Sequence, residues 1–101
     1  MGIVDIVMSC AKNSTLIKTR HYIEMLELRQ NGIVPDDDGI IDLLSTQTPV
    51  YIERQTNDNF KLFYSIDVTY DLIIVMSCKS TSPYKIALIT IHQQEARRRP
   101  G

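Results

Sequence analysis

The hydrophobic periodicity of the chain changes at Pro49, and this change limits the fold more than any other feature of the sequence. Before Pro49, apolar residues recur at the three- and four-residue spacing of amphipathic helices. After Pro49, apolar and polar residues alternate, as they do along half-buried strands. Helices that precede strands, rather than alternating with them, indicate an α+β layer fold.

Two to three helices are predicted in the first half of the chain. Apolar residues at helical spacing predict one over residues 3–12, and Thr19 is a suitable N-cap for a second over 20–31. A proline and three aspartates at 35–38 favour a third helix that opens with them and runs to about residue 45. Proline is tolerated in a first helical turn, and acidic groups there complement the helix dipole.

Four strands are predicted in the second half, at 50–54, 60–66, 70–78 and 84–92. The links between them are short and rich in turn residues, which favours antiparallel neighbours because parallel strands need long crossovers. Leu72 to Met76 is apolar on both sides, which predicts a central strand. The expected fold is therefore two to three N-terminal helices packed on a four-stranded, mainly antiparallel C-terminal sheet.

Length and composition fit one domain. A chain of 101 residues with 44% hydrophobic and 23% charged residues has room for one core and is close to globular averages. We expect residues 1–95 to form this domain and residues 96–101, with Arg97 to Arg99, to be a disordered basic tail. No apolar run approaches the roughly 20 residues of a membrane span, and no basic signal segment opens the chain. A cytoplasmic protein without membrane contact is expected.

No motif predicts a metal or a cofactor. Cys10 and Cys78 are distant in sequence and form no C-x-x-C pair. The acidic run ending at Gly39 places Ile40 at the next ligand position of a calcium loop, which is incompatible with binding. No glycine-rich phosphate loop, G-x-S-x-G elbow or H-E-x-x-H zinc helix occurs. The net charge of −1 gives no overall attraction to nucleic acid, but a local basic patch is compatible with it.

The start of the second helix is a candidate phosphate site. Unpaired backbone N–H groups and the helix dipole favour an anion there. Thr19, Arg20 and His21 add a hydroxyl, a cation and an imidazole, so the three residues could hold a phosphate of RNA or DNA. The structural alternative is that Thr19 only caps the helix and His21 packs at the edge of the core, which is the more common role for such residues.

Three residues are candidates for catalysis. His21 and Arg29 lie on one drifting helical ridge with Met25 between them, and could present an acid–base imidazole and a guanidinium to one groove. Alternatively, Arg29 pairs with an acidic residue of the next helix. His92 lies at the predicted end of the last strand. Imidazole and guanidinium groups can transfer protons and stabilise negative charge during RNA cleavage. Other strand-borne candidates, whose spacing selects no catalytic set, are Arg54, Lys61, Tyr64, Tyr70, Lys79 and Lys85.

The segment Lys18–Ile33 and the order of the predicted elements resemble a family of small prokaryotic domains of unknown function (number 4258). That family is grouped with RelE-like and BrnT-like toxins of toxin–antitoxin systems. Its pattern has a histidine, two arginines at helical spacing and a closing Gly-Ile. His21, Leu26 and Arg29 match the family's histidine, an apolar position and its second arginine. The general resemblance extends over about residues 3–93.

The chain departs from that pattern at two places. Met25 stands where the family often has its first arginine, and Gln30 and Asn31 precede Gly32. Similarity to the superfamily implies a RelE/BrnT-like α+β fold. Its toxin members cleave mRNA without metal and are neutralised by a protein partner.

Two main hypotheses about function follow. In the first, the protein is a metal-independent endoribonuclease of toxin–antitoxin type, with RNA and an antitoxin-like protein as partners. Arg20, His21 and Arg29 would hold phosphate, and a histidine or strand lysine would be the acid–base group. In the second, favoured by Met25 and the balanced charge, it is a non-catalytic protein- or RNA-binding module of the same fold. A homodimer through the sheet edge or the first helix is a further alternative.

Overall fold

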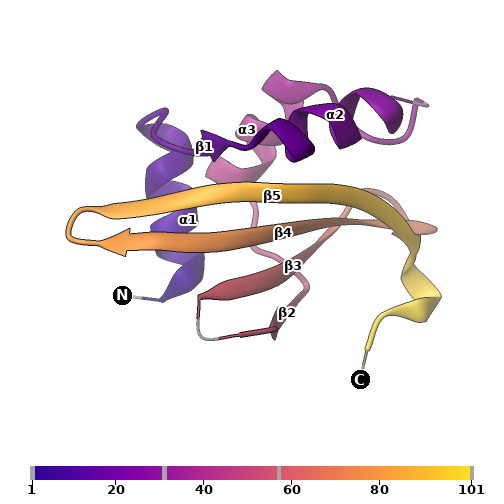
Figure 1. Cartoon of the computed structure of the whole chain (residues 1–101). Helices are drawn as coiled ribbons and strands as arrows, with labels where there is room; N and C mark the ends of the chain where they lie inside the picture. The colour runs from indigo at the N-terminus through magenta and orange to yellow at the C-terminus, as the bar shows by residue number, and fades with distance from the viewer. Residues whose placement is uncertain (1, 31, 57, 101) are drawn as a thin grey trace.

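The computed structural model describes residues 2–30, 32–56 and 58–100 and confirms the predicted α+β class (Figure 1). In these ranges, three α-helices and a five-stranded sheet are present. The helices are α1 (Ile3–Lys12), α2 (Arg20–Leu28) and α3 (Asp37–Thr46). The strands are β1 (Ile17–Lys18), β2 (Tyr51–Arg54), β3 (Asn59–Ser65), β4 (Tyr70–Thr81) and β5 (Tyr84–Glu95), and a 3-10 turn, Ala96–Arg98, follows β5.

The strands of the described chain lie in the order β1-β5-β4-β3-β2. Strands β2 to β5 form the predicted antiparallel meander, with β4 near its centre as the apolar run at 72–76 indicated. The predicted number of four strands was wrong, because Ile17 and Lys18 pair in parallel with Ala87 and Leu88 as a fifth strand. Two residues are too few to show alternation in a sequence, so only the pairing reveals this strand.

Side-chain caps set the starts of α2 and α3. The Thr19 hydroxyl accepts a hydrogen bond from the backbone N–H of Tyr22, which confirms Thr19 as the N-cap of α2. The Asp36 carboxylate accepts one from the N–H of Gly39 at 2.8 Å. A Cβ at Gly39 would lie 2.9 Å from the Pro35 Cβ, so glycine permits this tight first turn. Helix α2 ends at Leu28 rather than at the predicted residue 31.

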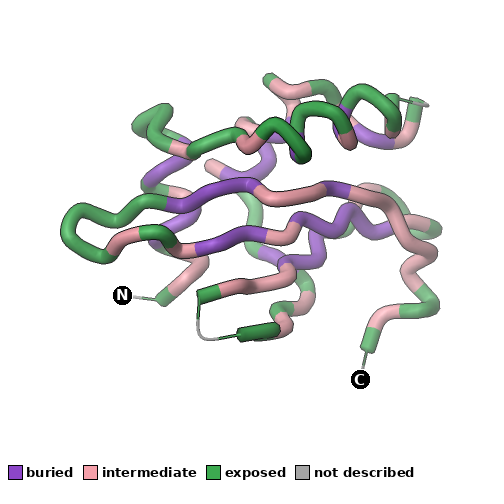
Figure 2. The backbone as a smooth tube through the Cα atoms, viewed as in Figure 1, coloured by how far each residue is buried: buried purple, intermediate pink, exposed green. Residues whose placement is uncertain are grey.

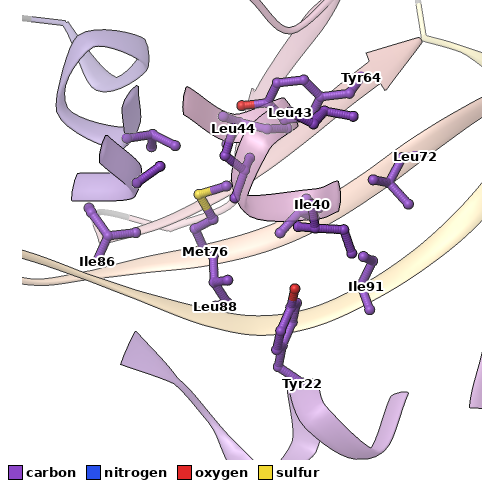
Figure 3. Packing of buried hydrophobic residues seen from close by; sticks show 14 of the residues in the cluster. Tyr22, Ile40, Leu43, Leu44, Tyr64, Leu72, Met76, Ile86, Leu88 and Ile91 are labelled. Carbon is purple, nitrogen blue, oxygen red and sulfur yellow. The ribbon is translucent and has the colours of Figure 1, made fainter. Parts of the chain in front are cut away.

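The helices bury one face of the sheet (Figures 1 and 2). This face is apolar along all three long strands, with the fully buried Leu62 on β3, Ile74 on β4 and Leu88 on β5. Helix α2 contributes Tyr22, whose ring points into the core toward Ile40 (Figure 3). None of the described helices is long and apolar enough to cross a membrane.

The segment after β5 folds against the sheet instead of leaving it (Figure 1). The backbone N–H of Ala96 donates to the carbonyl of Thr69 at 2.7 Å. The Arg99 guanidinium donates two hydrogen bonds, of 2.7 and 2.6 Å, to the carboxylate of Asp71 on β4. Residues 96–99, expected in a disordered tail, therefore have defined contacts, while the boundary of the domain at residue 95 stays a prediction.

Candidate functional site

The first candidate residue, Thr19, uses its hydroxyl within the fold. Besides capping α2, the hydroxyl donates to the carbonyl of Leu88 at 2.8 Å, and the Thr19 backbone N–H donates to the same carbonyl at 3.2 Å. These bonds join the start of α2 to the end of the β1–β5 pairing. The arrangement matches the structural alternative for Thr19, and phosphate binding by its hydroxyl stays an untested prediction.

Arg20 and His21 lie on the outer side of α2. The Arg20 side chain is 95% exposed and forms a loose ion pair with Glu24, at 3.4 Å, one turn along the helix. His21 is exposed to solvent next to it. Exposed pairs of this kind contribute little free energy, so nothing in the fold holds Arg20 in one orientation. The two residues face solvent rather than a formed pocket.

The pairing register defines a second face of the sheet, which bears the side chains that alternate with the core residues. Directly opposite residues of paired strands point to the same face. One row across this face is Tyr51, Phe63, Ile73 and His92. The next row toward the β4–β5 hairpin is Glu53, Lys61, Val75 and Thr90, and the row on the other side is Ser65, Asp71 and Gln94.

His92 is half-buried on this second face and has an altered acidity. Its pKa is lowered, chiefly because burial penalises the charged imidazolium, and further because Lys61 and Arg29 place positive charge nearby. Burial and like charge both favour the neutral ring. A neutral imidazole can accept a proton, so this environment suits a general base.

Arg29 is brought to His92 by the packing of α2 beside β5. Arg29 is the C-cap residue of α2 and is half-buried, and its Nε atom is buried without a hydrogen-bond partner among the described residues. The predicted ion pair with the next helix is not among the described contacts. The charge of Arg29 thus acts on His92, another of the three predicted catalytic residues, although no hydrogen bond joins the two side chains among the described contacts. His21 is exposed near the opposite end of α2, and its pairing with Arg29 in one site stays a prediction.

Lys61 is the other cation that acts on His92, and the sequence analysis did not distinguish it from the other strand lysines. Its ammonium lies 5.6 Å from the centroid of the Phe63 ring, and the Tyr51 ring meets Phe63 edge-on at 5.3 Å. Glu53 faces Lys61 in the register, but the two form no ion pair in the described structure. The correct pairing of β3 with β4, and of β4 with β5, would have identified Lys61, since this pairing places it one row from His92.

We call Arg29, Lys61 and His92 the cationic cluster. None of the four ion pairs in the described ranges involves either of its two permanent cations. Two half-buried cations without a carboxylate partner among the described ion pairs create a positive potential at a neutral imidazole. This arrangement is suited to binding an anion that carries a hydroxyl group close to the imidazole, which could accept the hydroxyl proton.

The described chain has few other groups that could form a functional site. No group of three or more His, Cys, Asp or Glu side chains in these ranges could hold a metal ion. Cys10 is buried and Cys78 half-buried, and both are free thiols. A cavity of about 280 Å³ lies between the end of α1, β1 and α3, but its lining contains none of the predicted site residues.

The chain is a small α+β protein in which helices pack on one face of a mixed sheet and charged side chains, including Lys61 and His92, lie on the other face. The chain belongs to the MJ0788 family, whose model matches residues 3–76. No curated protein and no solved structure matches the chain. The match covers α1 to most of β4, including Arg29 and Lys61, and ends before β5 and His92. This family match does not connect the chain with the domain family of unknown function (number 4258), or with the RelE-like and BrnT-like toxins, that the sequence analysis suggested.

Proposed function

We propose that the cationic cluster binds the phosphate backbone of single-stranded RNA and that His92 cleaves it without a metal ion. The observation that carries the proposal is the pairing register, which places Lys61 one row from His92 on the second face, together with the Nε atom of Arg29 at the end of α2, which is buried without a hydrogen-bond partner among the described residues. Burial and these two charges lower the pKa of His92. Phosphate oxygens would neutralise the two cations, and the half-buried ring of Tyr51 lies in the same row of the sheet as His92. Basic side chains with neighbouring aromatic rings are the usual elements of single-strand recognition.

The chemistry follows from a neutral imidazole next to a bound phosphate. His92 takes the proton from a ribose 2′-hydroxyl, the 2′ oxygen attacks the adjacent phosphorus, and the bond from phosphorus to the 5′ oxygen breaks. The leaving oxygen takes a proton from water, and the proton later released by His92 neutralises the hydroxide. The products are a 2′,3′-cyclic phosphate and a 5′-hydroxyl end. Arg29 and Lys61 stabilise the added negative charge of the phosphorane.

The resemblance of Lys18–Ile33 to toxin-related domains supports a more specific form of this proposal. The protein would then act as an mRNA-cleaving toxin of a toxin–antitoxin pair, restrained by a protein partner. The net charge of −1 is compatible with this, because a local cluster rather than the whole surface would attract RNA. Growth arrest on expression tests this specific form separately from the cleavage reaction.

The two histidines provide a direct test. Purified protein is incubated with single-stranded RNA in EDTA, and the product ends are identified by mass spectrometry. We expect His92→Gln to abolish cleavage, because glutamine keeps a similar volume but cannot take the proton. Lys61→Gln and Arg29→Gln should reduce kcat/KM at least tenfold each, as expected for loss of a charge that contacts the transition state.

His21→Gln is the matched control, because it removes the other imidazole from an exposed position. It should retain cleavage. The reverse result, in which only His21→Gln is inactive, would move the active site to the start of α2, where Thr19 and Arg20 were predicted to bind phosphate. Binding that persists in the wild type without any cleavage would support the non-catalytic RNA-binding module instead.

A further inference from the structure

The segment after β5 lies on the same face of the sheet as His92. Asp71, Ile73 and Val75 alternate along β4 on this face, and Ile73 pairs with His92 while Asp71 pairs with Gln94. Arg99 binds Asp71, and the Gln94 side-chain amide donates to the backbone carbonyl of Arg98 at 3.2 Å. The Arg99 guanidinium and the Arg98 carbonyl are therefore held at the Asp71–Gln94 row, which is one row of residues away from His92.

The contact between Arg99 and Asp71 is what holds this segment. Asp71 is fully buried, and both oxygens of its carboxylate accept a hydrogen bond from the Arg99 guanidinium. A bidentate pair of this kind fixes geometry as well as charge. The hydrogen bonds to Asp71 also raise the pKa of Arg99, as expected for a cation held by a carboxylate. The Arg99 guanidinium therefore stabilises the folded C-terminal segment.

The three arginines of the segment differ in their contacts. Arg97 forms an ion pair with Glu95 at 3.0 Å, so its charge is partly balanced. Arg98 is exposed, and its guanidinium has no partner in the described part of the chain, although its carbonyl is held by Gln94. Arg98 therefore combines a fixed backbone with an uncommitted cation, beside a site that already carries two positive charges.

We propose that Arg98 contacts a second phosphate of the RNA strand, and that Asp71 and Arg99 are positioning residues for this contact. This proposal rests on RNA binding by the cationic cluster, and it extends the RNA-binding surface from the row of His92 to the next row, which contains Gln94. Rows on one face are separated by two residues, or about 7 Å along the strands. A single strand that crosses His92 would then continue over the Gln94 row to Arg98.

The test measures binding of a fluorescent single-stranded 2′-O-methyl oligoribonucleotide, which lacks the 2′-hydroxyl needed for cleavage. Fluorescence anisotropy is recorded over a series of salt concentrations for the wild type and for Arg98→Gln. We expect Arg98→Gln to weaken binding several-fold at low salt. The slope of log K against log salt should become shallower by roughly 0.7, the value for one phosphate contact on a single strand.

Lys85→Gln is the matched control, because it removes one positive charge from an exposed position near the β4–β5 hairpin. It should leave the slope unchanged. Arg99→Gln should give the same loss of slope as Arg98→Gln, and the double variant should lose no more than either single variant. This non-additivity is expected when Arg99 acts only by positioning Arg98. Circular dichroism establishes that each variant is folded.

The outcomes separate the two proposals. If Arg98→Gln binds like Lys85→Gln while Lys61→Gln and Arg29→Gln bind more weakly, the role of Arg98 is overturned and the cationic cluster stands. If the wild type does not bind the oligonucleotide at low salt, both proposals are overturned. A larger loss for the double variant than for Arg98→Gln would show that Arg99 contacts RNA directly, which contradicts its assignment as a positioning residue.

Discussion

The two faces of the sheet are built on the same strands but carry different chemistry. On β4, Ile74 points to the helices and Ile73 to the other side, and both are fully buried. Ile74 belongs to a continuous apolar core, whereas Ile73 lies in a row with Phe63 and His92 and next to the buried carboxylate of Asp71. The helix-covered face gains stability from apolar burial. The second face combines buried apolar residues with charged groups, of which Asp71 and Arg99 are held by their mutual hydrogen bonds.

The largest difference between the faces is expected for alanine substitutions in β4. Ile74→Ala should lower the free energy of unfolding by about 2 to 5 kcal/mol, because packed helices cannot collapse into the cavity. Ile73→Ala should cost less, since the long side chains of the second face can move to fill the space. Urea denaturation followed by circular dichroism measures both. Equal losses would mean that the second face is as tightly packed as the core.

A smaller effect is expected where the C-terminal segment meets the second face. Arg99→Ala leaves the fully buried carboxylate of Asp71 without its partner, so the denaturation midpoint should fall. Adding Asp71→Asn should restore part of the loss, because the buried charge is then removed. The same denaturation experiment tests this, with Arg98→Ala as an exposed control that should change little. An additive loss in the double variant would contradict the contribution of this pair.

On the helix-covered face, Tyr22 is an exception to apolar packing. Its ring is fully buried, and its hydroxyl has no hydrogen-bond partner among the described residues. Burial, and then the negative charge of Asp37, raise the pKa of Tyr22. Tyr22→Phe removes a buried polar atom, and we expect it to raise the free energy of unfolding by roughly 1 kcal/mol. A loss of similar size would instead reveal a hydrogen bond from this hydroxyl to internal water.

The sequence predicted the helix-covered face better than the second face. Helical spacing before Pro49 and alternation after it were sufficient for the order of elements and for the central position of Leu72–Met76, because both depend on local periodicity. A brief extended piece at residues 15–17 could be predicted, but its pairing with β5 as strand β1 could not, because the partners are about 70 residues away. Lys61 and Asp71 could not be selected for a related reason, since their importance depends on which residues face them across strands.

The same limit applies to the candidate site. His92 and Arg29 were selected by residue type and position, but their proximity arises only when α2 packs beside β5. The residues Arg97 to Arg99 were predicted to lie in a disordered tail, because consecutive arginines cannot form a hydrophobic core. This segment is held against the sheet by the hydrogen bonds of Arg99 to the carboxylate of Asp71, which lies 28 residues earlier in the chain. Long-range pairing therefore determines the second face, and local patterning determines the first.

The smallest expected effect concerns the pH dependence that the cationic cluster gives to the second face. In the folded protein, burial and the charges of Lys61 and Arg29 hold the pKa of His92 below its ordinary value, which is about 6.5 in an unfolded chain. Between the two pKa values the unfolded chain binds more protons, so stability rises with pH in this window. The contribution of His92 to stability is full above about pH 6.5 and is lost as the pH falls through the folded pKa.

The variant His92→Gln should remove this pH-dependent part of the stability, whereas His21→Gln should retain it. Denaturation midpoints measured from pH 7.5 down to pH 5, in buffers of equal ionic strength, give the comparison. If Lys61→Gln weakens the pH dependence and His21→Gln does not, the charge on β3 acts on His92 in solution. An unchanged profile in both His92→Gln and Lys61→Gln would remove the electrostatic basis of the proposed site.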